Sequence, residues 1–79
     1  MGTLAIAYVL IIAEIGKEDD VLKELKKVPR VIEAYSVYGV YDIVAKVETS
    51  DVRELKVVMT EIRRLHYVRS TTTMIVAAS

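Results

Sequence analysis

Residues 31–48 read VIEAYSVYGVYDIVAKVE. Two runs rich in β-branched and aromatic residues, 31–38 and 40–48, flank Gly39. Such residues favour strands, and a glycine between two such runs marks a turn because it accepts a positive φ at little cost. The pattern predicts two antiparallel strands joined by a β-hairpin that turns at Gly39.

A helix is expected on each side of this hairpin. Residues 18–28 carry an apolar stripe at helical spacing, with acidic residues in the first turn and basic residues in the last, and Pro29 ends the helix. After the hairpin, Asp51 and Glu54 have the spacing of a capping box. They predict a second helix that runs to about Leu65.

The two ends of the chain supply the remaining strands, over residues 3–13 and 67–77. Residues 25–31 and 62–68 form a faint repeat, in which a helix ends in two basic residues and one apolar residue and a strand begins at a valine three positions on. The order β-α-β-β-α-β, with right-handed crossovers, predicts an α+β fold of the ferredoxin-like type. It has one four-stranded antiparallel sheet with two helices on one face.

The composition indicates that this single domain, residues 1–79, self-associates. The chain has 79 residues, of which 53% are hydrophobic, and its mean hydropathy is +0.35. Two helices cover only one face of the sheet, yet all four strands carry apolar side chains on both faces. Leaving such a face in water forgoes about 25 cal/mol for each Å² of apolar surface that could be buried. A two-fold dimer that pairs the bare sheet faces is therefore expected.

The sequence offers little support for catalysis, metal binding or nucleic-acid binding. It has no Cys and one His, and it lacks the zinc-protease, phosphate-loop, dinucleotide and nucleophile-elbow motifs. Its 11 basic and 11 acidic residues give no net charge, whereas strong nucleic-acid binders show a basic excess. The apolar run 4–13 is too short to span a bilayer. We expect a cytoplasmic, non-enzymatic protein without cofactor, metal site or membrane association.

Two polar features are candidates for a binding site. Asp42 follows the predicted turn on an otherwise mostly apolar strand, where a carboxylate is costly unless it is bonded. Two interpretations of Asp42 are compatible. In one, its carboxylate accepts hydrogen bonds from N–H groups of the turn; in the other, it pairs with the ammonium group of a ligand. Ser70, Thr71, Thr72 and Thr73 give the last strand four consecutive hydroxyls. They either reflect the strand propensity of Thr or donate to a ligand carboxylate.

These residues resemble a known family. The pattern Val31-x-x-Ala34-Tyr35-x-Val37-x-Gly39-x-Tyr41-Asp42, followed by a strand, a helix, Val68 and Thr71-Thr72-Thr73-Met74-Ile75-Val76, resembles the effector-binding domain of the Lrp/AsnC transcription regulators. This domain is also called RAM, for regulation of amino-acid metabolism. The resemblance extends from Thr3 to Val76, and its most specific part is the Gly-x-Tyr-Asp hairpin.

The resemblance implies an amino-acid-sensing module that regulates amino-acid metabolism or transcription. It implies dimers of the dimeric α/β-barrel kind that assemble further, often as a tetramer of dimers, with an amino acid bound where dimers meet. The ligand-contacting loop of the family falls on Gly39, Val40, Tyr41 and Asp42, and its last-strand positions fall on Ser70 to Thr73. The family's helix-turn-helix module is missing from this sequence, so we expect a stand-alone domain whose partners are its own copies or DNA-binding relatives.

Two alternatives remain open at the level of sequence. One is a small cofactor-free enzyme of the dimeric α/β-barrel kind, with His66 or a tyrosine as acid or base. The other is an ACT-like regulatory domain, which also binds amino acids but typically pairs its sheets side by side. The sequence does not name the ligand.

Overall fold

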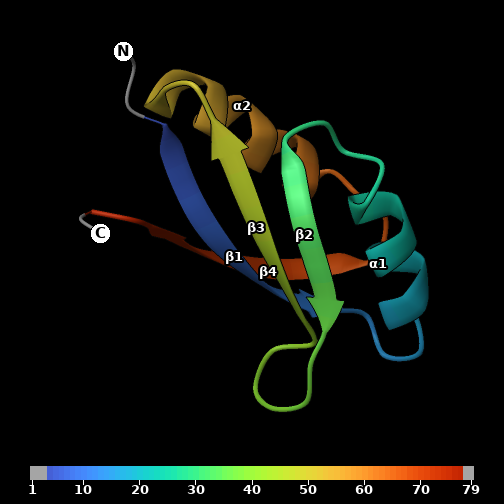
Figure 1. Ribbon diagram of the computed structural model, residues 1–79. Coiled ribbons are helices and arrows are strands. Elements are labelled where there is room, and N and C mark those ends of the chain that lie inside the picture. The colour runs from blue at the N-terminus through green and yellow to red at the C-terminus, as the bar shows by residue number, and fades with distance from the viewer. Residues whose placement is uncertain (1–3, 78–79) are drawn as a thin grey trace.

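The predicted order of elements is confirmed in the computed structural model, which describes residues 4–77 (Figure 1). The start of the first expected strand, at Thr3, lies outside the described residues. The elements are β1 (Ala5–Ala13), α1 (Glu18–Leu25), β2 (Val31–Ser36), β3 (Ile43–Thr49), α2 (Val52–Arg63) and β4 (Val68–Ile75).

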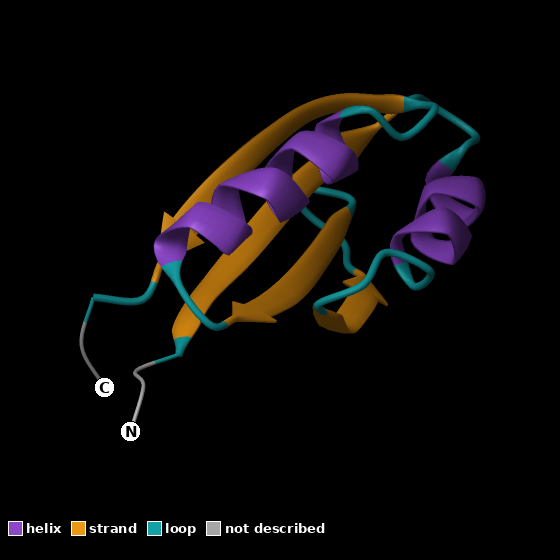
Figure 2. Ribbon diagram, turned by 90° about the horizontal axis from the view of Figure 1, so that it is seen from above, coloured by secondary structure: helices purple, strands orange, loops and turns teal. Residues whose placement is uncertain are grey.

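The four strands form one antiparallel sheet in the order β2-β3-β1-β4, so β2 and β4 are its edges. Both helices lie on the same side of this sheet (Figure 2). Because each helix connects two strands that are not neighbours in the sheet, both crossovers must pass over a face. This is the ferredoxin-like α+β fold that the sequence predicts.

The core lies between the helices and one face of the sheet. Strand side chains alternate between faces, so every second residue of β1 and β3 points toward the helices. Their apolar partners on α1 and α2 recur at helical spacing. The buried core consists of Ala7, Val9, Ile11, Ala13, Val21, Leu25, Val28, Ala34, Ile43, Ala45, Val47, Leu55, Val58, Met59 and Ile62.

The opposite side of the sheet, here called the bare face, is not covered by either helix. From β1 it carries Ile6, Tyr8, Leu10 and Ile12, which alternate with buried residues. Tyr8 and Met74 are opposite each other in the register of β1 and β4, and both are exposed. The bare face is thus apolar along its central strand.

The sequence repeat corresponds to a repeat in the backbone. Arg30 and Tyr67 each stand immediately before a strand, and both have positive φ values, 79° and 70°. Their carbonyl oxygens accept equivalent hydrogen bonds, from Glu48 N at 3.0 Å and from Glu14 N at 2.8 Å. A left-handed conformation is uncommon for residues other than glycine. Its occurrence at both helix-to-strand junctions shows that the two halves reverse direction in the same way.

The predicted hairpin is confirmed, since β2 and β3 pair antiparallel and Gly39 lies in the loop that joins them with a positive φ, but the predicted strand bounds are wrong. β2 ends at Ser36 instead of Tyr38, and β3 begins at Ile43 instead of Val40, which leaves a six-residue loop over residues 37–42. The physical reason is that the hairpin ladder ends at Val37 and Asp42: Val37 N donates to Asp42 O at 2.9 Å, but the Asp42 backbone N–H donates to Ile11 O on β1. As a consequence Tyr38 and Tyr41 lie on a loop. Independently of this loop, β4 begins at Val68 instead of Tyr67.

The predicted capping box begins α2. The Asp51 side chain accepts from Glu54 N at 2.8 Å, and the Glu54 carboxylate accepts from Ser50 N at 3.0 Å. We expect Asp51→Ala to lower the free energy of unfolding by about 1 kcal/mol, because a backbone N–H loses its acceptor. Chemical denaturation at fixed protein concentration measures this. Arg53→Ala, an exposed change on the same helix, is the control, and equal losses in the two variants would contradict the capping role.

The same carboxylate makes the stability depend on pH. Hydrogen bonds from the backbone N–H and side chain of Ser50, followed by the charge of Arg30, lower the pKa of Glu54. Because this pKa is lower in the folded chain than in the unfolded chain, the stabilisation is present at neutral pH and is lost as the pH falls through the acidic range. The stability difference between wild type and Glu54→Gln should therefore shrink on acidification in denaturation series. A difference that stays constant would contradict this.

Candidate functional site

The loop over residues 37–42 extends beyond the sheet between β2 and β3 (Figure 1). Its tip is open to solvent, with Tyr38 and Val40 at 107% and 82% of full exposure. Gly39 has φ 140°, a conformation that other residues rarely adopt, and it therefore permits this turn. Two of the predicted site residues, Gly39 and Val40, thus lie at an exposed tip.

Asp42 anchors the other limb of the loop to β1. Its Oδ2 accepts from Ala13 N at 2.8 Å, and its backbone N–H donates to Ile11 O at 2.9 Å. The last backbone pair between β1 and β3 is Ile11 with Ile43. The carboxylate therefore extends this ladder by one step, in the place of a backbone carbonyl. Asp42 thus accepts a backbone hydrogen bond, as predicted, but the donor is Ala13 N on β1 and not an N–H group of the turn.

Asp42 also lines a cavity of about 480 Å³ between the loop and the start of α1. This volume is within the range of about 300–1,000 Å³ that is typical of small-molecule sites. The lining combines three carboxylates, two hydroxyl-bearing side chains and one valine. The residues are Glu18, Asp19, Ser36, Val37, Tyr38 and Asp42.

Glu18 and Asp19 were not predicted as site residues. Their acidic run has an adequate local explanation, since carboxylates in the first helical turn interact favourably with the helix dipole. Only the packing of α1 next to the loop brings them to the same cavity as Asp42. No local sequence signal could have shown this proximity.

Tyr41 points to the opposite side of the loop from this cavity. Its hydroxyl lies 3.3 Å from the Thr72 hydroxyl on β4. β1 separates β3 from β4 in the sheet, and Thr72 pairs with Leu10, a bare-face residue of β1. The Tyr41 side chain therefore crosses β1 on the bare face.

The four hydroxyls of the last strand do not form one cluster. Ser70 and Thr72 pair with bare-face residues of β1, whereas Thr71 and Thr73 face the helices. The Thr73 hydroxyl donates to Met59 Sδ at 3.7 Å, which confirms this orientation. Of the predicted residues, the structure brings together Tyr41 with Thr72, and it leaves Thr71 and Thr73 on the other face.

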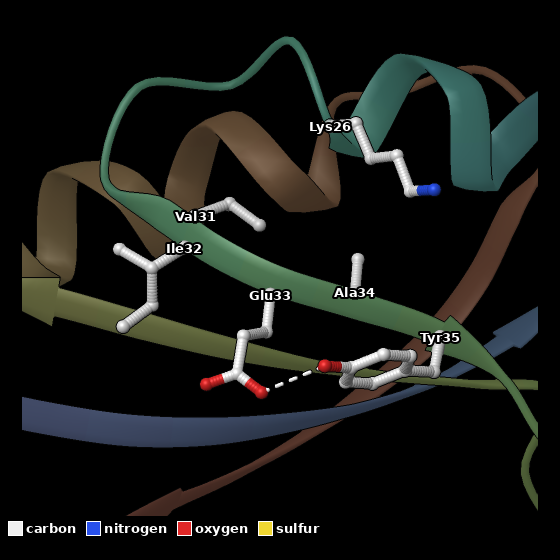
Figure 3. A pocket seen from close by; sticks show the side chains of 6 residues that line it. All are labelled: Lys26, Val31, Ile32, Glu33, Ala34 and Tyr35. Atoms are coloured by element: carbon white, nitrogen blue, oxygen red, sulfur yellow. Dashed lines mark hydrogen bonds between the residues drawn. The ribbon is translucent and has the colours of Figure 1, made fainter.

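A second cavity, of about 290 Å³, lies at the outer edge of β2, where Lys26 extends from the end of α1 over the strand (Figure 3). Ala34 is only 7% exposed because it pairs with buried Ala45 and faces the core, whereas four of the six residues of β2 are exposed. Tyr35 Oη donates to Glu33 Oε1 at 2.9 Å, and this bond raises the pKa of Tyr35. These two polar groups are thus already paired with each other.

Within residues 4–77, no group of three or more His, Asp or Glu side chains is placed to hold a metal ion. No helix in this part of the chain has the length and apolar character of a membrane span.

The comparison with known families matches the model described as the Lrp/AsnC ligand binding domain, over residues 6–79. The chain belongs to the Lrp/AsnC family.

Individual relatives agree with this assignment. The HTH-type transcriptional regulator FL11 of Pyrococcus furiosus is 34% identical over 76 residues, which cover 96% of this chain and 50% of the regulator. The chain thus spans about half the length of the curated relatives it matches.

Among solved structures, TTHA0845 from Thermus thermophilus superposes with a TM-score of 0.90 at 36% identity, and 95% of each chain is covered. FFRP-DM1 superposes with a TM-score of 0.86 at 41% identity, over 91% of this chain and 97% of that chain. Chains of comparable length therefore adopt the same fold as this Lrp/AsnC domain.

The positive φ of Gly39, in the loop over residues 37–42, can be tested by substitution. A Cβ added at Gly39 meets no atom within 4 Å, so any cost of Gly39→Ala comes from the backbone conformation alone. We expect a loss of about 1–3 kcal/mol in the free energy of unfolding. Val40→Ala, at the exposed neighbouring position, is the control and should change stability by less than about 0.5 kcal/mol. Equal stabilities of both variants and wild type would contradict the positive φ at Gly39.

Proposed function

We propose that this protein is a non-catalytic amino-acid-binding module that regulates amino-acid metabolism or transcription as a homo-oligomer. The observation that carries the proposal is the cavity that Asp42 lines in a domain of the Lrp/AsnC ligand-binding family. Regulation through FL11-like, DNA-binding relatives is part of the proposal, since those relatives are transcriptional regulators. We expect the protein to act in the cytoplasm and without direct contact to nucleic acid.

The chemistry of the cavity fits one end of an amino acid well. Among the described residues Asp42 uses only Oδ2 in a hydrogen bond, which leaves Oδ1 to accept from an ammonium group. Glu18 and Asp19 add negative charge to the same wall. Val37 and Tyr38 offer apolar surface for a side chain.

The other end of the ligand needs a donor that this cavity lacks. No Lys or Arg is among the described residues that line it. An α-carboxylate requires hydrogen-bond donors when it leaves water. Backbone N–H groups at the exposed tip, Gly39 and Val40, are available in one copy, and a second copy could supply the rest. This requirement supports a site that is completed by assembly.

A second copy has two adjoining surfaces to cover. One is the bare face. The other is the open edge of β4. Val76 N donates to Ile6 O at 2.8 Å, so the even-numbered residues of β4 direct their backbone groups toward β1. Residues 71, 73 and 75 then direct their N–H and C=O groups outward. Residues 70–77 contain no charge and no proline, the usual protections of an edge strand. We propose a dimer of the α/β-barrel kind, and a tetramer of such dimers.

Calorimetry against the twenty amino acids tests the ligand. We expect at least one to bind, and we expect Asp42→Ala to weaken its binding by about tenfold or more, because a charge-assisted hydrogen bond is lost. Arg53→Ala, on the outer side of α2, is the control and should bind as wild type does.

Two results would contradict the proposal in different ways. Absence of heat and of any thermal shift with all twenty amino acids would exclude the function. Unchanged binding by Asp42→Ala would exclude Asp42 from the site.

A further inference from the structure

A third cavity, of about 500 Å³, lies between α1 and the segment that joins α2 to β4. Its volume is also typical of small-molecule sites, and it shares no lining residue with the Asp42 cavity. One wall is formed by Asp20, Lys23 and Glu24 of α1, and the other by residues 64–67. The proposed function makes no use of this cavity.

The charged groups of this third cavity are balanced in sign and only partly paired. Glu24 forms an ion pair with Lys27 at 3.1 Å. In the part of the chain that the structure describes, no ion pair includes Asp20, Lys23 or Arg64. The cavity therefore offers one carboxylate and two cationic groups that are not bound to each other.

The backbone holds both walls of the cavity in place. On one wall, positions 20, 23 and 24 have the spacing of residues that share a face of a helix. On the other wall, Arg64 N donates to the last turn of α2 at 3.2 Å, and Tyr67 O accepts from Glu14 N at 2.8 Å. Lys17 Nζ lies 4.9 Å from the centroid of the Tyr67 ring. Little backbone ordering is thus needed when a ligand binds, which favours affinity.

We propose that this cavity is a second binding site, for a free amino acid with an apolar side chain, and that one copy of the chain forms it. Asp20 accepts from the α-ammonium group, while Arg64 and Lys23 donate to the α-carboxylate. The planar guanidinium of Arg64 suits this role because it can donate two parallel hydrogen bonds to a carboxylate. Leu65 and Tyr67 supply apolar surface for the ligand side chain.

The balance of charge favours a zwitterion over other small ligands. A phosphate or a nucleotide would be repelled by Asp20 and Glu24, and the side chain of a basic amino acid by Lys23 and Arg64. The Asp42 cavity lacks a cationic side chain for the α-carboxylate, whereas the third cavity has groups for both ends of an amino acid. The second site therefore does not depend on the function proposed for the Asp42 cavity.

Calorimetry on Asp42→Ala tests this site separately, with leucine, methionine and phenylalanine as probes. We expect at least one of them to bind, with one molecule per chain. Asp20→Asn and Arg64→Gln, each added to Asp42→Ala, should weaken this binding by about tenfold or more, because each removes a charge from the hydrogen bonds to the ligand. Glu61→Gln and Arg63→Gln, at exposed positions of α2 outside the cavity, are the matched controls and should bind as Asp42→Ala does.

Derivatives of the probe that binds test the two ends of the ligand. The N-acetyl derivative lacks the ammonium charge, and the methyl ester lacks the carboxylate charge. Each should bind about tenfold more weakly or worse, because the site pairs with both charges. Undiminished binding of either derivative would overturn the assignment of a zwitterion to this cavity.

The failure of this site and the failure of the proposed function give different results. Absence of heat with all three probes in Asp42→Ala, or binding that Asp20→Asn and Arg64→Gln leave unchanged, would overturn the second site. The proposed function stands in that case if the wild type binds an amino acid that Asp42→Ala does not bind. Binding that is equal in wild type and Asp42→Ala but weakened by Arg64→Gln would support the second site and exclude Asp42 from recognition of that amino acid.

Discussion

Two helices cannot cover both faces of a four-stranded sheet, and most properties of this small domain follow from that constraint. The buried core lies on one side of β1 and β3, where α1 and α2 pack. The other side carries Ile6, Leu10 and Ile12 along the central strand without a covering layer. An apolar surface of this kind usually marks an interaction site. The proposed assembly is therefore a consequence of the fold rather than an addition to it.

The position of Asp42 connects this sheet to the candidate binding site. Its carboxylate takes the place of a backbone acceptor at the end of the β1–β3 ladder, and so holds the second limb of the loop at residues 37–42. The same residue lines the cavity with the first turn of α1. Structural and binding roles of Asp42 are thus compatible, because a carboxylate has two oxygens and the sheet uses one.

Local signals in the sequence were sufficient to predict the fold. The capping box at Asp51 and the repeated helix-to-strand junctions predict the six elements in their correct order, although α1 ends at Leu25 and not at Val28, before Pro29. The loop was predicted less well, since its length depends on hydrogen bonds between Asp42 and β1, which is distant in the chain. Proximity of Glu18 to Asp42 likewise arises only from tertiary packing. The division of Ser70–Thr73 between two faces does follow from strand periodicity. It means that the four hydroxyls, predicted as donors for a ligand carboxylate, do not all lie on one face of the sheet.

The most direct test of the account is sedimentation velocity at micromolar concentration, on the wild type and on Leu10→Glu. Leu10 lies on the bare face, so a carboxylate there should oppose the covering of this face by a second copy. We predict that the wild type sediments as a dimer or a larger assembly and that Leu10→Glu shifts it toward the single chain. Val57→Glu, at an exposed position of α2, should leave the assembly unchanged. A wild type that sediments as one well-behaved chain would contradict the central claim.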